Sequence, residues 1–305
     1  MTALAVYTTI YPGVEPYLPD WSRSLQAQTD KDFDLWIGLD QLTVEEAKRA
    51  MGYNPSATWV EAVAGDTPAQ VRQRALAQIA STCEAVVLVD SDDTLRPSRV
   101  ATAREMLHTA SLVGCALSLV DQRGNDLGLT FTLEDGAEPH DVFPRNNIFG
   151  LSNSAFDCGL LRRCLPLPAS AVLIDWYLAT SAWLFGARMA FTERVQMHYR
   201  QHDANTARVA APFTPEQVRR DTQLVRHHFA LMKGISREGC MPNRLSLLDE
   251  VTADIEAFYR QIAAKPRVLK HYVEALNALQ TAPLWWSCVA HPALQHMWTS
   301  EKEEA

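Results

Sequence analysis

Short apolar runs alternate with longer amphipathic stretches over the first two-thirds of the chain. One run, residues 85–89, contains five apolar, mostly β-branched residues between polar neighbours. A half-exposed strand would alternate apolar and polar residues, so this run predicts a strand that is buried on both faces, as in a parallel sheet. We therefore expect residues 85–89 to form the central strand.

The same pattern predicts further elements around the central strand. Strands are expected at residues 4–10, 34–39, 58–63, 111–120, 127–132 and 189–192. Helices are expected at about residues 68–80, 97–109, 156–164 and 175–185, and a first helix, delayed by Pro16, Pro19 and Asp20, is expected to run to about residue 28. Because strands and helices alternate, the chain is predicted to be α/β, built from parallel βαβ units. The turn at residues 121–125 favours antiparallel pairing of the strands on either side of it, which would make the sheet mixed.

Two other segments have a different character. Residues 134–147 are polar and rich in Asp, Pro and Asn, which predicts a loop over the mouth of a binding crevice. From residue 214 the pattern is helical alone, with apolar seams that end near residue 232 in one helix and near residue 262 in the next, and a third helix after Pro266. We therefore divide the chain into an α/β domain, residues 1–206, and an all-helical C-terminal extension, residues 207–305.

Composition limits the function classes. The formal net charge of -8 argues against a nucleic-acid-binding surface and implies that a polyphosphate ligand would need a cation. The six cysteines lack Cys-x-x-Cys spacing and are expected to be reduced, mostly core thiols in a cytoplasmic protein. No basic residue precedes Arg23 and no apolar run has transmembrane length, so we expect neither a signal peptide nor a membrane span. Contact with a membrane would then be peripheral.

The candidate chemistry follows the central strand, where Asp90, Asp92 and Asp93 lie within four residues. Ligands of open α/β sheets bind beyond the carboxyl ends of the strands. Carboxylates this close repel one another unless a cation lies between them, so the cluster predicts a metal-bound nucleotide. The alternative is that these are ordinary turn and helix-capping residues.

Four other places accompany this cluster along the chain. The five places are Tyr11-Pro12, Arg72-Gln73-Arg74-Ala75-Leu76, Val89-Asp90-Ser91-Asp92-Asp93, Ile174-Asp175-Trp176-Tyr177-Leu178 and Tyr199-Arg200-Gln201-His202-Asp203-Ala204-Asn205-Thr206. With these motifs in this order, residues 1–206 resemble the family-2 inverting glycosyltransferases of the GT-A fold. The chain departs from the family pattern around Tyr11, after Asp40, and at Gln73 in place of Asn, all in the half that would hold the nucleotide.

The resemblance implies transfer of a sugar, from a UDP-sugar by preference, to an acceptor hydroxyl of a carbohydrate or small molecule. A role in polysaccharide biosynthesis or in glycosylation of a metabolite fits equally. The residues expected at the donor nucleotide are Thr9, Tyr11, Asp40, Arg72, Asp90 and Ser91. Asp92 would hold Mn²⁺ or Mg²⁺, with His202 as a further ligand or as a structural histidine.

The acceptor side is implied in the same way. Asp175 would be the general base, or alternatively only a helix N-cap. Trp176 and Arg200 would contact the acceptor or a phosphate; the alternatives are a core tryptophan and a salt-bridging arginine.

Other interpretations of the same residues remain open. Asp90 and Asp92 are also similar to the first motif of haloacid-dehalogenase phosphatases, but the lysine which that class requires is absent between Asp93 and Lys233. A sugar-nucleotide-binding protein without turnover is the non-catalytic alternative. The extension would pack on the catalytic domain, shape the acceptor site or form a homodimer. Its segments Leu284-Trp285-Trp286 and Met297-Trp298 are either an interfacial membrane patch or, as we favour, core or oligomer contacts.

Overall fold

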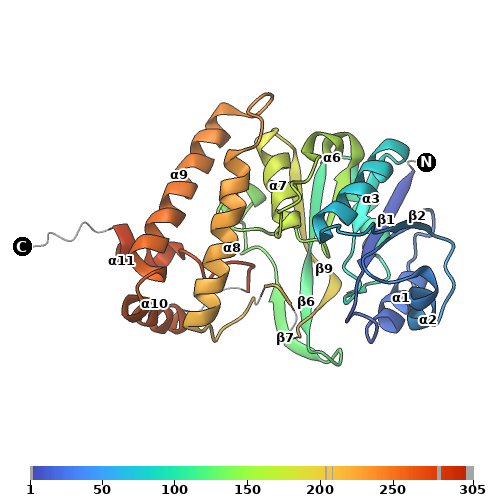
Figure 1. The fold of residues 1–305 in the computed structure, drawn as a ribbon, viewed down its shortest axis with the longest axis horizontal. Helices are drawn as coiled ribbons and strands as arrows, with labels where there is room; N and C mark the ends of the chain where they lie inside the picture. Colours follow the sequence, from blue (N-terminus) through green and yellow to red (C-terminus); the bar gives the residue numbers. More distant parts are fainter. Residues whose placement is uncertain (1–2, 203–204, 208, 280–282, 300–305) are drawn as a thin grey trace, which may run out of the picture.

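The computed structural model describes residues 3–202, 205–207, 209–279 and 283–299, which form a mixed sheet flanked by helices and a helical C-terminal part (Figure 1). The strands are β1 Leu4–Ile10, β2 Asp34–Leu39, β3 Thr58–Glu61, β4 Ala85–Leu88, β5 Thr94–Leu95, β6 Leu112–Val120, β7 Asp126–Phe131, β8 Ser154–Asp157 and β9 Met189–Arg200. The helices are α1 Leu18–Gln26, α2 Val44–Met51, α3 Pro68–Thr82, α4 Arg99–Leu107, α5 Pro139–Val142, α6 Cys158–Cys164, α7 Ile174–Leu184, α8 Pro215–Lys233, α9 Pro242–Phe258, α10 Pro266–Ala278 and α11 His296–Thr299, with a π-helix at Tyr259–Ala263 and a 3₁₀-helix at Pro292–Leu294.

The sheet has the order β3-β2-β1-β4-β8-β6-β9-β5, and β7 pairs with β6 at the side. Strands β1 to β4 run parallel to one another, whereas β8 is antiparallel to both β4 and β6. Every residue of β4 is buried, as the apolar run at 85–89 predicts, and β6 and β7 form the expected antiparallel pair. The prediction of a mixed α/β sheet is confirmed.

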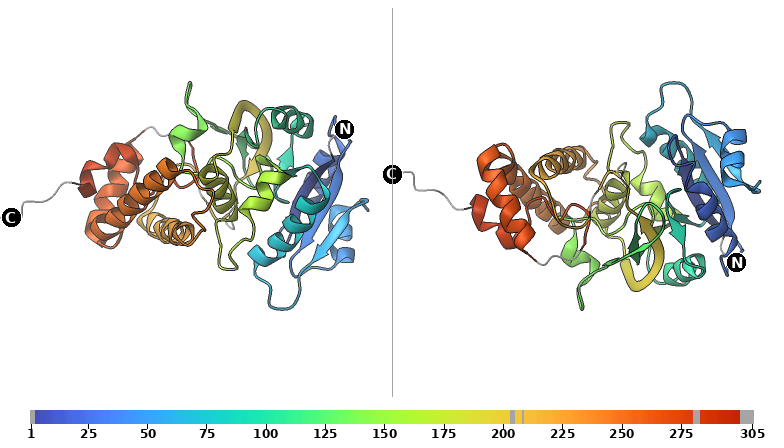
Figure 2. Two further views of the ribbon diagram at one scale, coloured as in Figure 1. Left: turned by 90° about the horizontal axis from the view of Figure 1, so that it is seen from above. Right: turned by 90° about the horizontal axis from the view of Figure 1, so that it is seen from below.

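The helical part packs on the α/β part through α7. In Figures 1 and 2, α8 and α9 lie beside α7, on the side away from β1 and β2. The predicted apolar seam of α8 is buried at Val218, Val225, Phe229 and Met232, and the seam of α9 continues into the π-helix. Burial of these seams therefore holds the helical part together and, as in the contact of Phe229 with Trp176, attaches it to α7.

Two predicted elements need correction, and two helices were not predicted. The helix expected at residues 156–164 begins only at Cys158, because Phe156 pairs with Val86 and Leu112 in β8 and Asp157 caps the helix. Strand β9 continues well beyond residue 192, since it pairs with β6 and then with β5. The pattern also missed α2, which Thr43 and Glu46 begin with a capping box, and α5 within the predicted loop.

The burial of side chains tests two predictions, that the C-terminal tryptophans form a membrane patch or a core, and that the cysteines are core thiols. Trp285, Trp286 and Trp298 are only 4%, 5% and 4% exposed, so a membrane patch is wrong and the core alternative is confirmed. In the part of the chain that the structure describes, no helix has the length and apolar character needed to span a membrane. Five of the six cysteines are buried, as expected for core thiols, and Cys240 is half-buried.

Candidate active site

The carboxyl ends of β1, β2 and β4 meet at one edge of the sheet because these strands are parallel. The Asp40 backbone N–H donates to the carbonyl of Ile10 at 2.9 Å, which joins the end of β2 to the end of β1. The Ser91 hydroxyl donates to the carbonyl of Thr9 at 2.8 Å, which joins the segment after β4 to the same place. Asp40 and the aspartate loop, residues 90–93, therefore lie at the same edge, as the sequence predicts.

The three carboxylates of the aspartate loop have different surroundings. Asp93 is buried and accepts hydrogen bonds from the backbone N–H of Arg200 at 2.7 Å and from the Ser152 hydroxyl. Asp90 is half-buried and accepts from the same hydroxyl at 3.1 Å. Asp92 faces His202, with 2.9 Å between Oδ2 and Nε2. Asp93 thus fixes the loop, whereas Asp90 and Asp92 face the site.

The electrostatics show that these carboxylates share one poorly hydrated region. Burial raises the pKa of Asp90 to about 7; the charge of Asp92 adds to this effect and the Arg72 guanidinium opposes it. Burial, and then the charges of Asp92 and Asp90, hold the pKa of Asp93 well above its ordinary value. The pKa of the Tyr11 hydroxyl is also raised, by burial and by these carboxylates. A cation at this point would relieve the repulsion.

The residues fit an open metal site. No group of three His, Cys, Asp or Glu side chains among the described residues is arranged to enclose a metal ion. The Asp92 carboxylate and the His202 imidazole are one oxygen and one nitrogen ligand side by side. Mg²⁺ is usually held by one or two carboxylates together with substrate phosphates and water, and Mn²⁺ also prefers oxygen ligands. These two side chains can therefore hold such an ion if a diphosphate completes its coordination.

Arg200, at the end of β9 and in the motif at residues 199–206, supports the aspartate loop. Arg200 is 3% exposed, and its guanidinium donates to the carbonyls of Asp92 at 2.8 Å and Gln122 at 3.0 Å and to Asp20 Oδ2 at 3.2 Å. These contacts use one N–H on each of the three nitrogens, and the salt bridge to Asp20 matches the salt-bridging alternative; a phosphate or acceptor contact of Arg200 stays a prediction. His202 stacks on Tyr17, with 5.1 Å between ring centroids. Asp203 and Ala204 of this motif lie outside the described residues.

Asp175 is the second residue of α7 and is half-buried. The N-cap position of α7 is Leu173, which gives no side-chain capping bond, and the Asp175 carboxylate two residues further on interacts with backbone N–H groups of the first turn. Its Oδ2 accepts from Asn147 Nδ2 at 2.8 Å. Burial raises the pKa of Asp175 to about 6, against the lowering effect of backbone N–H groups at the helix start and of Arg72. A carboxylate with this pKa can accept a proton near neutral pH.

Several predicted contacts have other roles. Trp176 is fully buried and stacks on His228, with 4.4 Å between ring centroids; the acceptor contact is therefore wrong and the core alternative is confirmed. Ser91 is fully buried and Thr9 is 4% exposed, with its hydroxyl 2.9 Å from that of Tyr7. The Ser91 side chain joins the segment after β4 to the end of β1, and the Thr9 hydroxyl bonds within β1; their nucleotide contacts stay predictions.

Arg72 is half-buried on α3 and lies where its charge acts on both Asp90 and Asp175. Its guanidinium donates a long, 3.5 Å hydrogen bond to the carbonyl of Pro68 in its own helix. Sequence reasoning missed Asn147 and Ser152, which hold Asp175 and the aspartate loop. The available signal was two polar residues in the otherwise apolar stretch 147–152.

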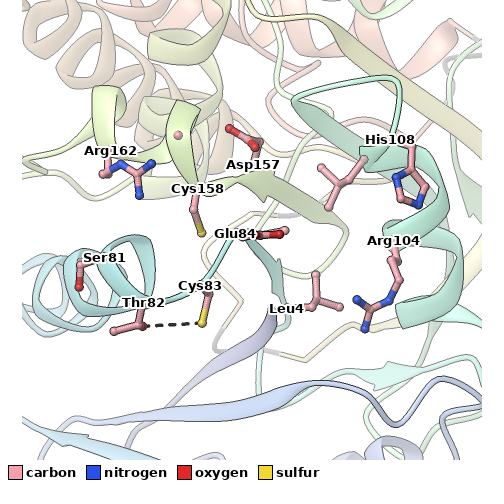
Figure 3. A pocket seen from close by; sticks show the side chains of 13 residues that line it. Leu4, Ser81, Thr82, Cys83, Glu84, Arg104, His108, Asp157, Cys158 and Arg162 are labelled. Carbon is pink, nitrogen blue, oxygen red and sulfur yellow. Dashed lines mark hydrogen bonds between the residues drawn. The ribbon is translucent and has the colours of Figure 1, made fainter. Parts of the chain in front are cut away.

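Two cavities lie near these elements. One of about 490 Å³ opens at the amino ends of β1 and β4, at the edge of the sheet opposite the aspartates, and is lined by Cys83, Cys158 and Arg162 among others (Figure 3). The other, of about 280 Å³, adjoins His202 and is lined by residues of α8, including Gln217. Only the second cavity borders the candidate active site.

Comparison with known proteins identifies the fold. No protein-family model and no curated protein sequence matches the chain. The mannosyltransferase PcManGT from Pyrobaculum calidifontis, in complex with GDP-Man and Mn²⁺, superposes with a TM-score of 0.57 and 16% identity over 92% of this chain and 76% of that one. S. aureus TarS 1-349 in complex with UDP-GlcNAc gives a TM-score of 0.51 and 15% identity over 90% of both chains.

A longer S. aureus TarS structure gives a TM-score of 0.53 at 17% identity over 84% of this chain. The chain spans 43% of the length of that TarS structure. The mixed, mostly parallel sheet flanked by helices, together with these neighbours, shows the GT-A fold with a helical C-terminal part.

Proposed function

We propose that the protein is an inverting glycosyltransferase that moves a sugar from a nucleotide-diphosphate sugar to an acceptor hydroxyl. The observation that carries this proposal is the arrangement of Asp90 and Asp92 after β4 opposite Asp175 at the start of α7. The charge of Asp175 contributes to the raised pKa of Asp90, which supports a single site containing both groups. We assign residues 1–206 to the transferase domain and 207–305 to the extension.

The donor side needs neutralisation of a departing diphosphate. We assign Asp92 and His202 to Mn²⁺ or Mg²⁺, which when bound would stabilise the charge that develops on the leaving group. Arg72 is the cation of α3 nearest to this chemistry and would contact the phosphates. Tyr11, Asp40 and Asp90 would contact the nucleotide or the donor sugar.

The acceptor side needs a base. Asp175 would remove the proton of the acceptor hydroxyl on the face of the sugar opposite the leaving group, so that a single displacement inverts the configuration. The neighbouring structures hold UDP-GlcNAc and GDP-Man, which supports a hexose nucleotide as donor, and we favour UDP. The haloacid-dehalogenase alternative is not retained, because the fold is GT-A. A homodimer through the helical part stays a prediction.

The test is a calorimetric titration of UDP, dTDP, GDP, CDP and ADP into the protein, with Mn²⁺ and then with EDTA. We expect one nucleotide to bind with Mn²⁺ and its affinity to fall in EDTA. Sugar transfer from the matching donor would then separate an enzyme from a binding protein. If no nucleotide binds under either condition, the proposal fails.

A further inference from the structure

The last part of the chain reaches back to the residues that support Asp175. Trp285 forms an antiparallel β-bridge with Asn147, the hydrogen-bond partner of Asp175. Trp286 stacks parallel to Trp176, the next residue after Asp175, with 6.3 Å between ring centroids and 11° between ring planes. Two consecutive tryptophans therefore contact Asn147, which hydrogen-bonds the candidate base, and Trp176, which follows it in α7.

The orientation of the Asn147 side chain is fixed. Asn147 is fully buried, and its Oδ1 accepts from the Phe149 backbone N–H at 3.0 Å. The amide Nδ2 donates to the Phe149 carbonyl at 3.2 Å and to Asp175 Oδ2 at 2.8 Å, so both ends of the amide have partners. A shift of Asn147 would therefore move or lose a hydrogen bond that sets the position of the carboxylate.

Trp285 packs directly on the backbone of this segment. A Cβ at Gly150 would lie 2.5 Å from Trp285 Cη2, so the indole occupies the space that any side chain there would need. The ring also packs on Phe131, with 4.1 Å between centroids, and its Nε1 donates to the Tyr199 hydroxyl at 3.4 Å. Residues 147–150 are thus fixed between Asp175 on one side and Trp285 on the other.

Trp286 has a backbone conformation that is unusual for its residue type. Its φ is 65°, in the left-handed region that bulky residues rarely adopt. Such a conformation persists only where the surroundings determine it. Here Trp286 packs towards Trp176 while Trp285 packs on Gly150.

We propose that Trp285 and Trp286 are positioning residues for Asp175, acting through Asn147 and Trp176, so that the C-terminal segment completes the candidate active site. This inference rests on the proposed function, in which Asp175 is the base. The charged groups that act on Asp175 are Arg72 from α3 and Asp90 from the end of β4.

The test compares Trp285→Leu and Trp286→Leu with Trp298→Leu in the full chain. Trp298 is a matched control: it is equally buried in the helical part, but it packs on Phe258 and Tyr272 and donates to Asp254. The first readout needs no transfer. The pKa of the Asp175 carboxyl is measured by NMR of protein labelled with ¹³C at aspartate, with Asp175→Asn to assign the signal.

Loss of the Asn147 hydrogen bond removes an effect that lowers the pKa of Asp175. We therefore expect this pKa to move upward in Trp285→Leu, in the direction given by Asn147→Leu, and to stay at the wild-type value in Trp298→Leu. The same pKa in wild type, Trp285→Leu and Trp298→Leu would overturn the positioning role whatever the transfer activity.

The second readout is transfer kinetics. Misplacement of a catalytic group should lower kcat about tenfold or more in Trp285→Leu and Trp286→Leu, with donor KM unchanged. Manganese-dependent nucleotide binding in the same preparations reports that the domain is folded, and Trp285→Phe should recover most of the loss. Wild-type kcat in both leucine variants would also overturn the proposal. If instead Asp175→Asn keeps transfer while the Asp175 pKa shifts in Trp285→Leu, the contact is upheld and the proposed role of Asp175 fails.

Discussion

Replacement of the candidate base tests the proposed chemistry most directly. Asp175→Asn changes one oxygen to an amide nitrogen, and the side-chain carbonyl can still accept from Asn147, so the fold and the donor site should be retained. What is lost is a group that can take a proton. General-base catalysis contributes about 10²- to 10⁴-fold, so we expect kcat to fall by that factor, which is about 2.7–5.4 kcal/mol in the barrier.

The pH dependence of the same enzyme gives an independent check. Because burial raises the pKa of Asp175 to about 6, the wild-type carboxyl should become protonated, and kcat should decline, as the pH falls below about 6. Nucleotide release is followed from pH 5 to 8 for wild type and Asp175→Asn, and nucleotide affinity with Mn²⁺ is measured alongside. Asp175→Asn should bind the nucleotide normally and lack the acid limb. Transfer within about threefold of wild type would refute the reasoning, since general-base catalysis is worth at least about a hundredfold.

Three further outcomes follow from the site. Asp92→Asn should weaken nucleotide binding in Mn²⁺ but not in EDTA; equal affinity of wild type and variant in Mn²⁺ would remove Asp92 as a metal ligand. Arg200→Met removes hydrogen bonds from a buried cation to the carbonyls of Asp92 and Gln122 and should cost about 2 kcal/mol or more in urea unfolding, whereas Arg194→Met at an exposed position of β9 should cost little. Asp175 has a folded-state pKa above its ordinary 3.8, so its ionisation should lower wild-type stability as pH rises from about 4 to 6. Thermal unfolding across this range should show a falling Tm in wild type and a smaller fall in Asp175→Asn.

Local sequence patterns predict correctly the elements that bury a continuous or periodic apolar face. The run at 85–89 and the seams of α8 and α9 are examples, because burial on a given face requires apolar residues at a fixed spacing. Strand β9 was underestimated for the opposite reason. Its middle contains Thr192, Glu193 and Arg194, where its register with β6 is irregular, so neither apolar nor alternating character marks a strand.

The supports of the site could not be read from the sequence because they join distant positions. Asn147 meets Asp175 across 28 residues, and Ser152 meets Asp90 across 62. The local signal, two polar residues in the otherwise apolar stretch 147–152, does not say which distant side chains they meet. Their roles follow only from the sheet topology, which places β8 beside β4 and brings the segment before β8 to the edge that holds the aspartates.

Motif resemblance supplied the residue types at the site but not the direction of each side chain. Arg200 and Trp176 both lie in matched motifs, yet each points into the protein, one under the aspartate loop and the other against α8. The inward direction of the Arg200 side chain has a physical basis. With the backbone N–H of Arg200 on buried Asp93 and its guanidinium on the Asp92 carbonyl, the loop is held by groups that leave the Asp90 and Asp92 carboxylates directed to the site. A loop built in this way leaves Asp90 and Asp92 available to a cation that arrives with the donor, because the arginine donates to the loop backbone and not to those two carboxylates.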